Sequence, residues 1–209
     1  FGEAWDFSKK SMRDRAEELI EQQRPFILIG SPMCTAFSSW QYINNKKRDP
    51  DIVAKEQAAG LIHLAWCCRM YAKQIERGAF FLHEHPAFST SWQQPYVMDL
   101  MKRPEVGRVL ADQCQFGQQT DNGDPIKKHT GFMSKASKLL DVLDKRCFGR
   151  DGICSRRRVG AHALCNGKFA RRAAIFQQEL CEIILRGAHL QMIHEGMMKP
   201  GKHGPSIEM

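Results

Sequence analysis

Two side chains suited to covalent chemistry, Cys34 and Glu84, each follow a short apolar segment of the chain. Residues 26–30 are apolar or small, as in a strand that is covered on both faces, and Ser31-Pro32 ends the run. Cys34 is therefore expected just beyond the carboxyl end of a strand, where open α/β sheets place their chemistry. A thiol there is a nucleophile if its pKa is lowered, and otherwise a buried structural cysteine.

The second apolar segment, residues 79–83, stops at the polar tripeptide Glu84-His85-Pro86. If both segments are strands of one sheet, a nucleophile and a carboxylic acid face one pocket at its edge. The alternatives are that Glu84 is an exposed loop carboxylate and that His83 and His85 serve as metal ligands or as structural histidines.

A further group of reactive side chains lies in a glycine-rich segment, residues 146–167. Its spacing is Cys-x6-Cys-x7-His-x2-Cys, formed by Cys147, Cys154, His162 and Cys165. Three thiolates and one imidazole suit tetrahedral zinc. Because the first gap is wider than in common zinc motifs, incidental loop cysteines are the alternative.

The composition favours a polyanionic partner and a reducing compartment. The chain has 209 residues, a formal charge of +8 and a pI near 9.2. No apolar run approaches the ~20 residues that span a bilayer, and the first residues do not read as a secretory signal. Adjacent Cys67-Cys68 argue against a disulfide framework, so we expect an intracellular protein, nuclear in a eukaryote or cytoplasmic in a phage or bacterium.

Hydrophobic periodicity predicts an alternation of helices and strands, and therefore an α/β fold. Helices are expected over residues 8–23, 52–77, 95–102, 135–143 and 168–186, the last ending at Gly187. Strands are expected over residues 26–30, 79–83, 106–116 and 131–134. The predicted units are a core (1–145), a Cys/His-rich loop or knuckle (146–166), a helix packed on the core (167–192) and a tail (193–209).

The two strand ends together resemble motifs of the DNA (cytosine-5) methyltransferases. That family has Pro-Cys followed by Phe-Ser, and this chain has Pro32-Met33-Cys34-Thr35-Ala36-Phe37-Ser38, with one more residue between proline and cysteine. The family's Glu-Asn-Val element corresponds to Glu84-His85-Pro86. The chain is most similar to a divergent branch carried by phages and retroelements, which also has counterparts of Cys114-Gln115-Phe116-Gly117 and Lys128-His129-Thr130.

The resemblance implies a partial Rossmann-like methyltransferase sheet flanked by helices. It also implies that Cys34 adds to carbon 6 of a cytosine while Glu84 binds the ring at N3, with the methyl group taken from S-adenosylmethionine. Pro32, Gly167 and Ala170 are the residues it places beside that cofactor. Nothing before residue 26 matches the family's glycine-bearing cofactor loop, so we expect the principal cofactor half-site to be missing from this chain.

The implied partner is DNA with its target base flipped out of the duplex. The expected nucleic-acid contacts are Ser38, Lys46, Lys47, Arg48, Lys128, Arg156 and Arg157. Two alternatives stay open at this stage. One is a non-catalytic nucleic-acid-binding remnant of a mobile element, and the other is a cysteine hydrolase that pairs Cys34 with a histidine base.

Overall fold

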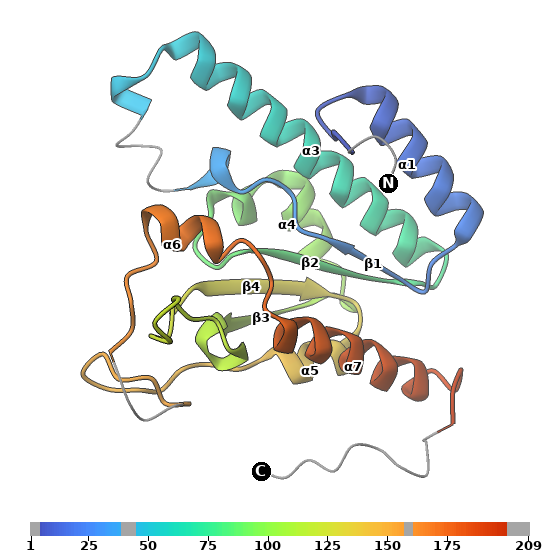
Figure 1. The fold of residues 1–209 in the computed structure, drawn as a ribbon. Coiled ribbons are helices and arrows are strands. Elements are labelled where there is room, and N and C mark those ends of the chain that lie inside the picture. The colour runs from blue at the N-terminus through green and yellow to red at the C-terminus, as the bar shows by residue number, and fades with distance from the viewer. Residues whose placement is uncertain (1–4, 39–44, 157–160, 200–209) are drawn as a thin grey trace.

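The computed structural model describes residues 5–38, 45–156 and 161–199, and its centre is a four-stranded mixed sheet (Figure 1). The strands are β1 (Ile27–Gly30), β2 (Phe80–Pro86), β3 (Gly107–Asp112) and β4 (His129–Ser134). Their order is β1-β2-β4-β3, with β1 parallel to β2 and β4 antiparallel to both of its neighbours. The α/β class expected from the alternating pattern is thereby confirmed.

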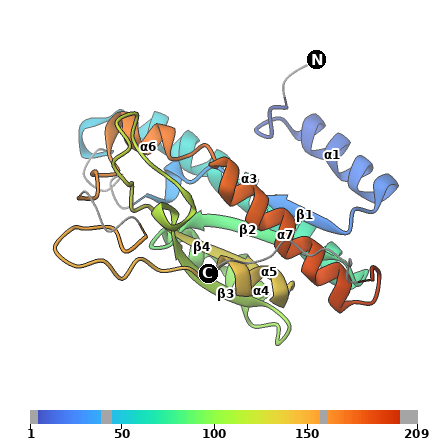
Figure 2. The same ribbon diagram turned by 60° about the horizontal axis from the view of Figure 1, so that its bottom comes forward.

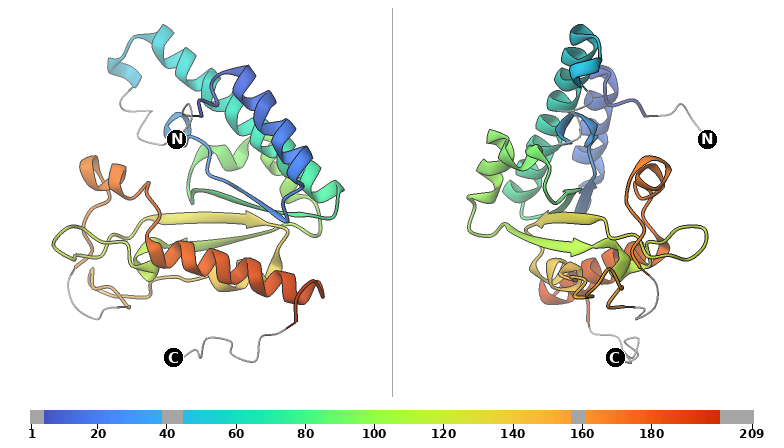
Figure 3. Two further views of the ribbon diagram at one scale, coloured as in Figure 1. Left: turned by 45° about the vertical axis from the view of Figure 1, so that its right-hand side comes forward. Right: turned by 90° about the vertical axis from the view of Figure 1, so that its left-hand side faces the viewer.

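Three helices cover one face of the sheet: α1 (Lys10–Gln23), α3 (Pro50–Glu76) and α4 (Pro95–Met101). Figure 3 shows them on the same side of the strands. Strand residues Leu28, Phe81 and Met133 pack there in one core cluster with Leu64 and Tyr71 of α3. Alternate strand residues point to opposite faces, so this set is one of two complementary rows.

The opposite face is covered by α5 (Ser137–Leu143) and α7 (Gln178–His194), which Figure 2 brings to the front. The second row, which includes Phe80, Leu82 and Phe132, packs there with Leu139 and Leu180. Shorter elements complete the chain: the 3-10 helices η1 (Thr35–Phe37), η2 (Asn45–Lys47), η3 (Thr90–Gln93) and η4 (Gln113–Phe116), and the helix α6 (Gly167–Arg172). Within the described residues, no helix is long and apolar enough to cross a bilayer.

Two strand predictions need correction. Strand β1 is an edge strand of the sheet and is not covered on both faces. Its residue Ile29 keeps 46% of its surface exposed. Strand β2 does not stop at His83 but continues through Glu84 to Pro86. The polar residues that suggested a loop are therefore inside the sheet, where Glu84 is only 4% exposed.

The expected final helix over residues 168–186 is also wrong in its bounds. Helix α6 ends at Arg172, and α7 begins at Gln178 and continues to His194. Gly187 does not end a helix but lies inside α7, where a Cβ atom would come within 2.5 Å of Leu139 Cδ1. The missing side chain is what lets α7 approach α5 closely. The strand expected over residues 106–116 ends at Asp112 and turns into η4.

Candidate functional site

The reactive residues gather at the side of the sheet where β1, β2 and β3 end and β4 begins, and we call this side the reactive edge. In the register of the strands, Gly30 lies beside His83, and Asp112 at the end of β3 lies beside His129 at the start of β4. The loop that carries Cys34 leaves β1 at this edge, and Glu84 follows His83 on the neighbouring strand. The topology therefore places the loop that carries the thiol beside the last part of β2, where Glu84 lies shortly before the strand ends.

Two side-chain contacts fix the Cys34 loop to β2. The hydroxyl of Ser31 donates a hydrogen bond to Oε2 of Glu84, which ties the start of the loop to the carboxyl group. The ring of His85 donates from Nε2 to the carbonyl oxygen of Pro32 at 3.1 Å. Cys34 is half-buried beyond these anchors and begins the 3-10 helix η1.

Lys128 is the cation of this site. Its Nζ lies 3.6 Å from Oε1 of Glu84 and donates to the carbonyl oxygen of Ala173 at 3.2 Å, with 17% of the side chain exposed. Burial raises the pKa of the Cys34 thiol, whereas the charge of Lys128 lowers it and that of Glu84 raises it. The expected phosphate ligand thus lies against the carboxyl group instead of on the open surface.

The two histidines of β2 are neutral packing groups. His83 hydrogen bonds through Nδ1 to the hydroxyl of Tyr71 at 3.2 Å, and His85 lies 2.6 Å from the hydroxyl of Ser91 through its Nδ1. Burial lowers the pKa of His85 to about 4 and that of His83 well below its usual value. The His83 ring stacks on that of His85, which in turn holds the Cys34 loop at Pro32, so the structural alternative fits both histidines.

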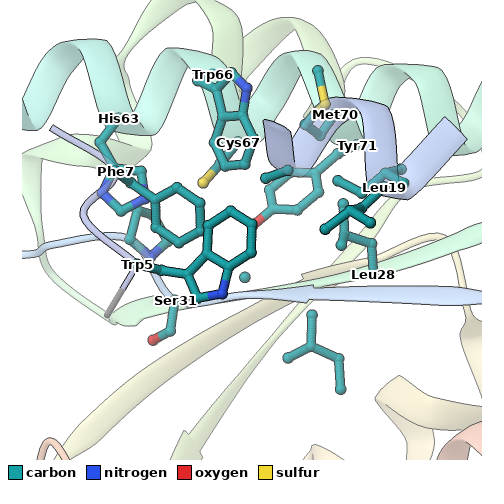
Figure 4. A pocket seen from close by; sticks show the side chains of 15 residues that line it. Trp5, Phe7, Leu19, Leu28, Ser31, His63, Trp66, Cys67, Met70 and Tyr71 are labelled. Atoms are coloured by element: carbon teal, nitrogen blue, oxygen red, sulfur yellow. The ribbon is translucent and has the colours of Figure 1, made fainter. Parts of the chain in front are cut away.

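A cavity of about 410 Å³ adjoins the start of the Cys34 loop, between α1, α3 and β1. Its lining is mostly apolar and includes Pro32, with the aromatic rings of Trp5, Phe7 and Trp66 gathered on the side of α1 and α3 (Figure 4). Of the three expected cofactor contacts, Pro32 lines this cavity. Gly167 and Ala170 do not, and are exposed on α6 at the edge where β1 and β2 end (Figure 1).

The expected nucleic-acid contacts are spread over several places. Ser38 and Lys46 line a second, more polar cavity of about 550 Å³, and Lys47 is exposed beside it on η2. Arg48 forms an ion pair with Glu56 at 2.6 Å, and Arg156 forms one with Glu179 at 2.6 Å. Arg157 lies outside the described residues.

A Cys/His group like the expected one is present, with one member exchanged. The ligand atoms of four side chains lie within 4.8 Å of one another, and these are Cys114, Cys147, Cys154 and His162. Cys165 lies outside this group, and its place is taken by Cys114 from η4. Burial raises the pKa of the Cys147 thiol, but hydrogen bonds from Ser155, Gly149 and Cys114 together outweigh burial, and the net shift of the pKa is downward. The group is a buried arrangement that could hold a metal.

In comparisons with protein-family models, curated proteins and solved structures, nothing matches the chain. The family resemblance seen in the motifs therefore stays an expectation. The geometry shows a carboxyl group hydrogen bonded to the start of the loop that carries the thiol, a neighbouring apolar cavity and a Cys/His group.

Proposed function

We propose that this chain carries the cytosine-binding catalytic site of a DNA (cytosine-5) methyltransferase. The observation that carries the proposal is the link between the two strand ends. Ser31 binds the Glu84 carboxyl group while His85, the next residue of β2, holds the loop that presents Cys34. A nucleophile and an acid held in this way can address two atoms of one flat ring.

Cys34 would act as the nucleophile. Its thiolate forms a bond to carbon 6 of cytosine, and the electron pair of the carbon 5–carbon 6 double bond moves to carbon 5. Burial works against the thiolate, so the positive charge of Lys128, which lowers the pKa of Cys34, is the feature that favours it. Departure of the sulfur, after carbon 5 has lost its proton, restores the ring.

Glu84 would bind the opposite side of the ring at N3. Its Oε2 is taken by Ser31, but its Oε1 has no hydrogen-bond partner among the described residues and lies 3.6 Å from Lys128. A buried carboxyl oxygen without a hydrogen bond is costly in a folded chain, and a ligand atom at that position would satisfy it. We assign that atom to N3 of the base. N3 of cytosine carries no hydrogen, so the carboxyl group of Glu84 must hold the proton of this hydrogen bond, and the Lys128 side chain must shift as the ring enters.

S-adenosylmethionine would supply the methyl group to carbon 5. The cavity beside Pro32 has the size and apolar, aromatic lining that suit a flat heterocycle such as adenine. Its described lining contains no carboxylate for the ribose and no ion-pair partner for the amino-acid part. We therefore assign Trp5, Phe7 and Trp66 to the adenine ring, and the described residues of this cavity offer no such partners for the polar half of the cofactor.

The sheet agrees with this proposal at the level of fold. Strand β4 runs antiparallel between β2 and β3, and β3 therefore runs in the same direction as β2. A sheet of the α/β class with helices on both faces is what the resemblance to Rossmann-like methyltransferases implies. This is an analogy of fold, so it adds to the site geometry and does not replace it.

The sharpest test separates the cytosine chemistry from methyl transfer. Addition of Cys34 makes carbon 5 able to take up a proton from water, so the chain should exchange tritium from carbon 5 of cytosine in duplex DNA without any cofactor. We expect exchange by the natural chain and by Cys181→Ser, which removes an exposed thiol on α7. We expect none from Cys34→Ser and a large loss from Glu84→Gln.

A second experiment tests the cofactor. With S-adenosylmethionine present, DNA that contains 5-fluorocytosine should form a covalent adduct at Cys34, located by peptide mass spectrometry. If DNA binds but neither exchange nor adduct occurs, the non-catalytic nucleic-acid-binding alternative is favoured. Exchange that persists in Cys34→Ser would remove this residue from the mechanism.

A further inference from the structure

We propose that the buried Cys/His group is a structural zinc site that ties the loop after α5 to the end of β3. Its ligands are Cys114, Cys147, Cys154 and His162. The donor set is three sulfurs and one imidazole nitrogen, which suits Zn²⁺ better than the oxygen-seeking cations Mg²⁺ and Ca²⁺. All four ligand positions are filled by protein side chains, as in structural and unlike catalytic zinc sites.

The distances agree with a tetrahedral ion. Sγ of Cys147 lies 4.0 Å from Sγ of Cys154 and 3.5 Å from Nε2 of His162. Zinc bonds of the usual lengths at tetrahedral angles require roughly 3.8 Å between two sulfurs and roughly 3.6 Å between sulfur and nitrogen. A disulfide would need a sulfur–sulfur separation of about 2.05 Å, so the two thiols are free and available as ligands.

Polar groups around the sulfurs supply the contacts that thiolate ligands take. Ser155 donates to Sγ of Cys147 from its backbone nitrogen and from its hydroxyl, both at 3.4 Å. The amide nitrogen of Gln115 lies 3.5 Å from Sγ of Cys114 and 3.7 Å from Sγ of Cys154. Donors directed at ligand atoms orient them and stabilise their charged form.

The backbone holds the ligands in place from both sides. A bridge between Ile153 and Ala161, with a 2.8 Å hydrogen bond from the nitrogen of His162 to the carbonyl oxygen of Gly152, sets the histidine beside Cys154. The nitrogen of Cys147 donates to Oδ2 of Asp112 at 2.8 Å. Asp112 ends β3, so the loop ligands are positioned against the strand end that leads to Cys114.

The Cys/His group is also linked by a hydrogen bond to the reactive edge of the sheet. Lys127 donates from Nζ to the carbonyl oxygen of Cys147 at 3.2 Å, and the next residue, Lys128, is the cation beside Glu84. A bound zinc would therefore order the segment that enters β4 as well as the loop itself. The zinc proposal can be tested independently of methyl transfer, because metal content can be measured without any activity.

The test is zinc content of the full chain, purified in reducing buffer without chelator and passed over a chelating resin to remove loosely held ions. We expect one zinc per chain, and loss of that zinc in Cys154→Ser and Cys114→Ser. Cys165→Ser is the matched control and should keep the metal, since Cys165 lies outside the group. Absence of zinc from the natural chain, even after zinc is supplied, would overturn the proposal.

Three further outcomes test the ligand set and guard against variants that fail to fold. Cobalt titrated into the metal-stripped natural chain should give the charge-transfer and ligand-field bands of a tetrahedral site with thiolate ligands, and their absence would contradict the inference. Retention of zinc by Cys114→Ser together with its loss from Cys165→Ser would restore the spacing-based set. A Cys147–Cys154 disulfide found in freshly purified protein would also count against zinc.

Discussion

The ammonium group of Lys128 lies 3.6 Å from Oε1 of Glu84, and the same charge lowers the pKa of Cys34. One cation thus acts on both groups proposed to contact the base. With only 17% of its side chain exposed, Lys128 is shielded from the salt that screens surface pairs.

Lys128→Met should make Cys34 less reactive. Removing the positive charge takes away the influence that lowers the pKa of Cys34, so burial and Glu84 raise it further. At a fixed pH near neutrality we expect slower alkylation by iodoacetamide, and a pH profile displaced upward. The rate is read at Cys34 by peptide mass spectrometry. Lys102→Met, at an exposed residue of the same type, should leave both unchanged, and an unaltered profile in Lys128→Met would refute the assignment.

Ser31→Ala should destabilise the fold through Glu84. The hydroxyl of Ser31 satisfies one oxygen of a carboxyl group that is 4% exposed, and its loss leaves that oxygen buried without a donor. We expect a decrease of about 1–3 kcal/mol in the free energy of unfolding, measured by urea denaturation. Ser8→Ala removes a hydroxyl whose bond to Asp6 is exposed, and should cost much less. Equal losses in the two variants would show that the Ser31 contact is not special.

Stability should fall in mild acid because of the β2 histidines. Burial lowers the pKa of His85 from 6.5 to about 4, so the unfolded chain binds more protons than the folded chain between these pH values. The contribution of neutral His85 to the free energy of unfolding is therefore fully present above pH 6.5 and is lost as the pH falls toward 4. His85 alone accounts for roughly 3 kcal/mol of this loss.

The measurement is urea unfolding over that pH range. His85→Gln should show a shallower decline than the natural chain, even if it is less stable throughout. His194→Gln, at an exposed residue that ends α7, should keep the natural slope. Indistinguishable slopes for all three proteins would mean that buried histidines do not cause the acid sensitivity.

Gly187→Ala should be destabilising although alanine is the better helix former. A Cβ atom at this position comes within 2.5 Å of Leu139 Cδ1 and 2.9 Å of Leu139 Cα, so α5 and α7 must separate. Such overpacking costs about 1–3 kcal/mol, more than the roughly 1 kcal/mol that alanine gains in helix propensity. The melting temperature shows whether the net effect of Gly187→Ala is destabilising. Leu185→Ala, on the exposed side of α7, should change the melting temperature little. A rise in melting temperature for Gly187→Ala would disprove the close contact.

Local pattern was enough to locate most of the elements. Apolar periodicity predicted helices over residues 8–23, 52–77 and 95–102, which the structure has as α1, α3 and α4 with shifts of a few residues at their ends. It failed where tertiary packing decides. Glu84 and His85 look like loop residues in the sequence, but β2 buries them with partners from a distant segment, Ser31 at Oε2 of Glu84 and Pro32 at Nε2 of His85.

The metal group shows the same limit. Spacing selected Cys147, Cys154 and His162 correctly as neighbours, since they share one loop. It selected Cys165, which is close in sequence, and missed Cys114, which comes from the 3-10 helix after another strand. The position of Cys114 just after a strand that ends at the reactive edge could have suggested it as a ligand. It was overlooked because it is far from the other three in sequence.

The position of β1 at the rim of the sheet gives the two proposed reactive groups unequal anchorage. Among the described strands, β1 pairs with β2 alone, whereas β2 is held between β1 and β4. Local opening that frees the rim strand would carry the sulfur nucleophile away and leave the acid in place. The rim also presents unpaired backbone groups that a further strand could meet. A segment that pairs with the free side of β1 would restrain Cys34 more than Glu84. Pairing at that strand would therefore control the reactivity of the nucleophile and leave the acid in place.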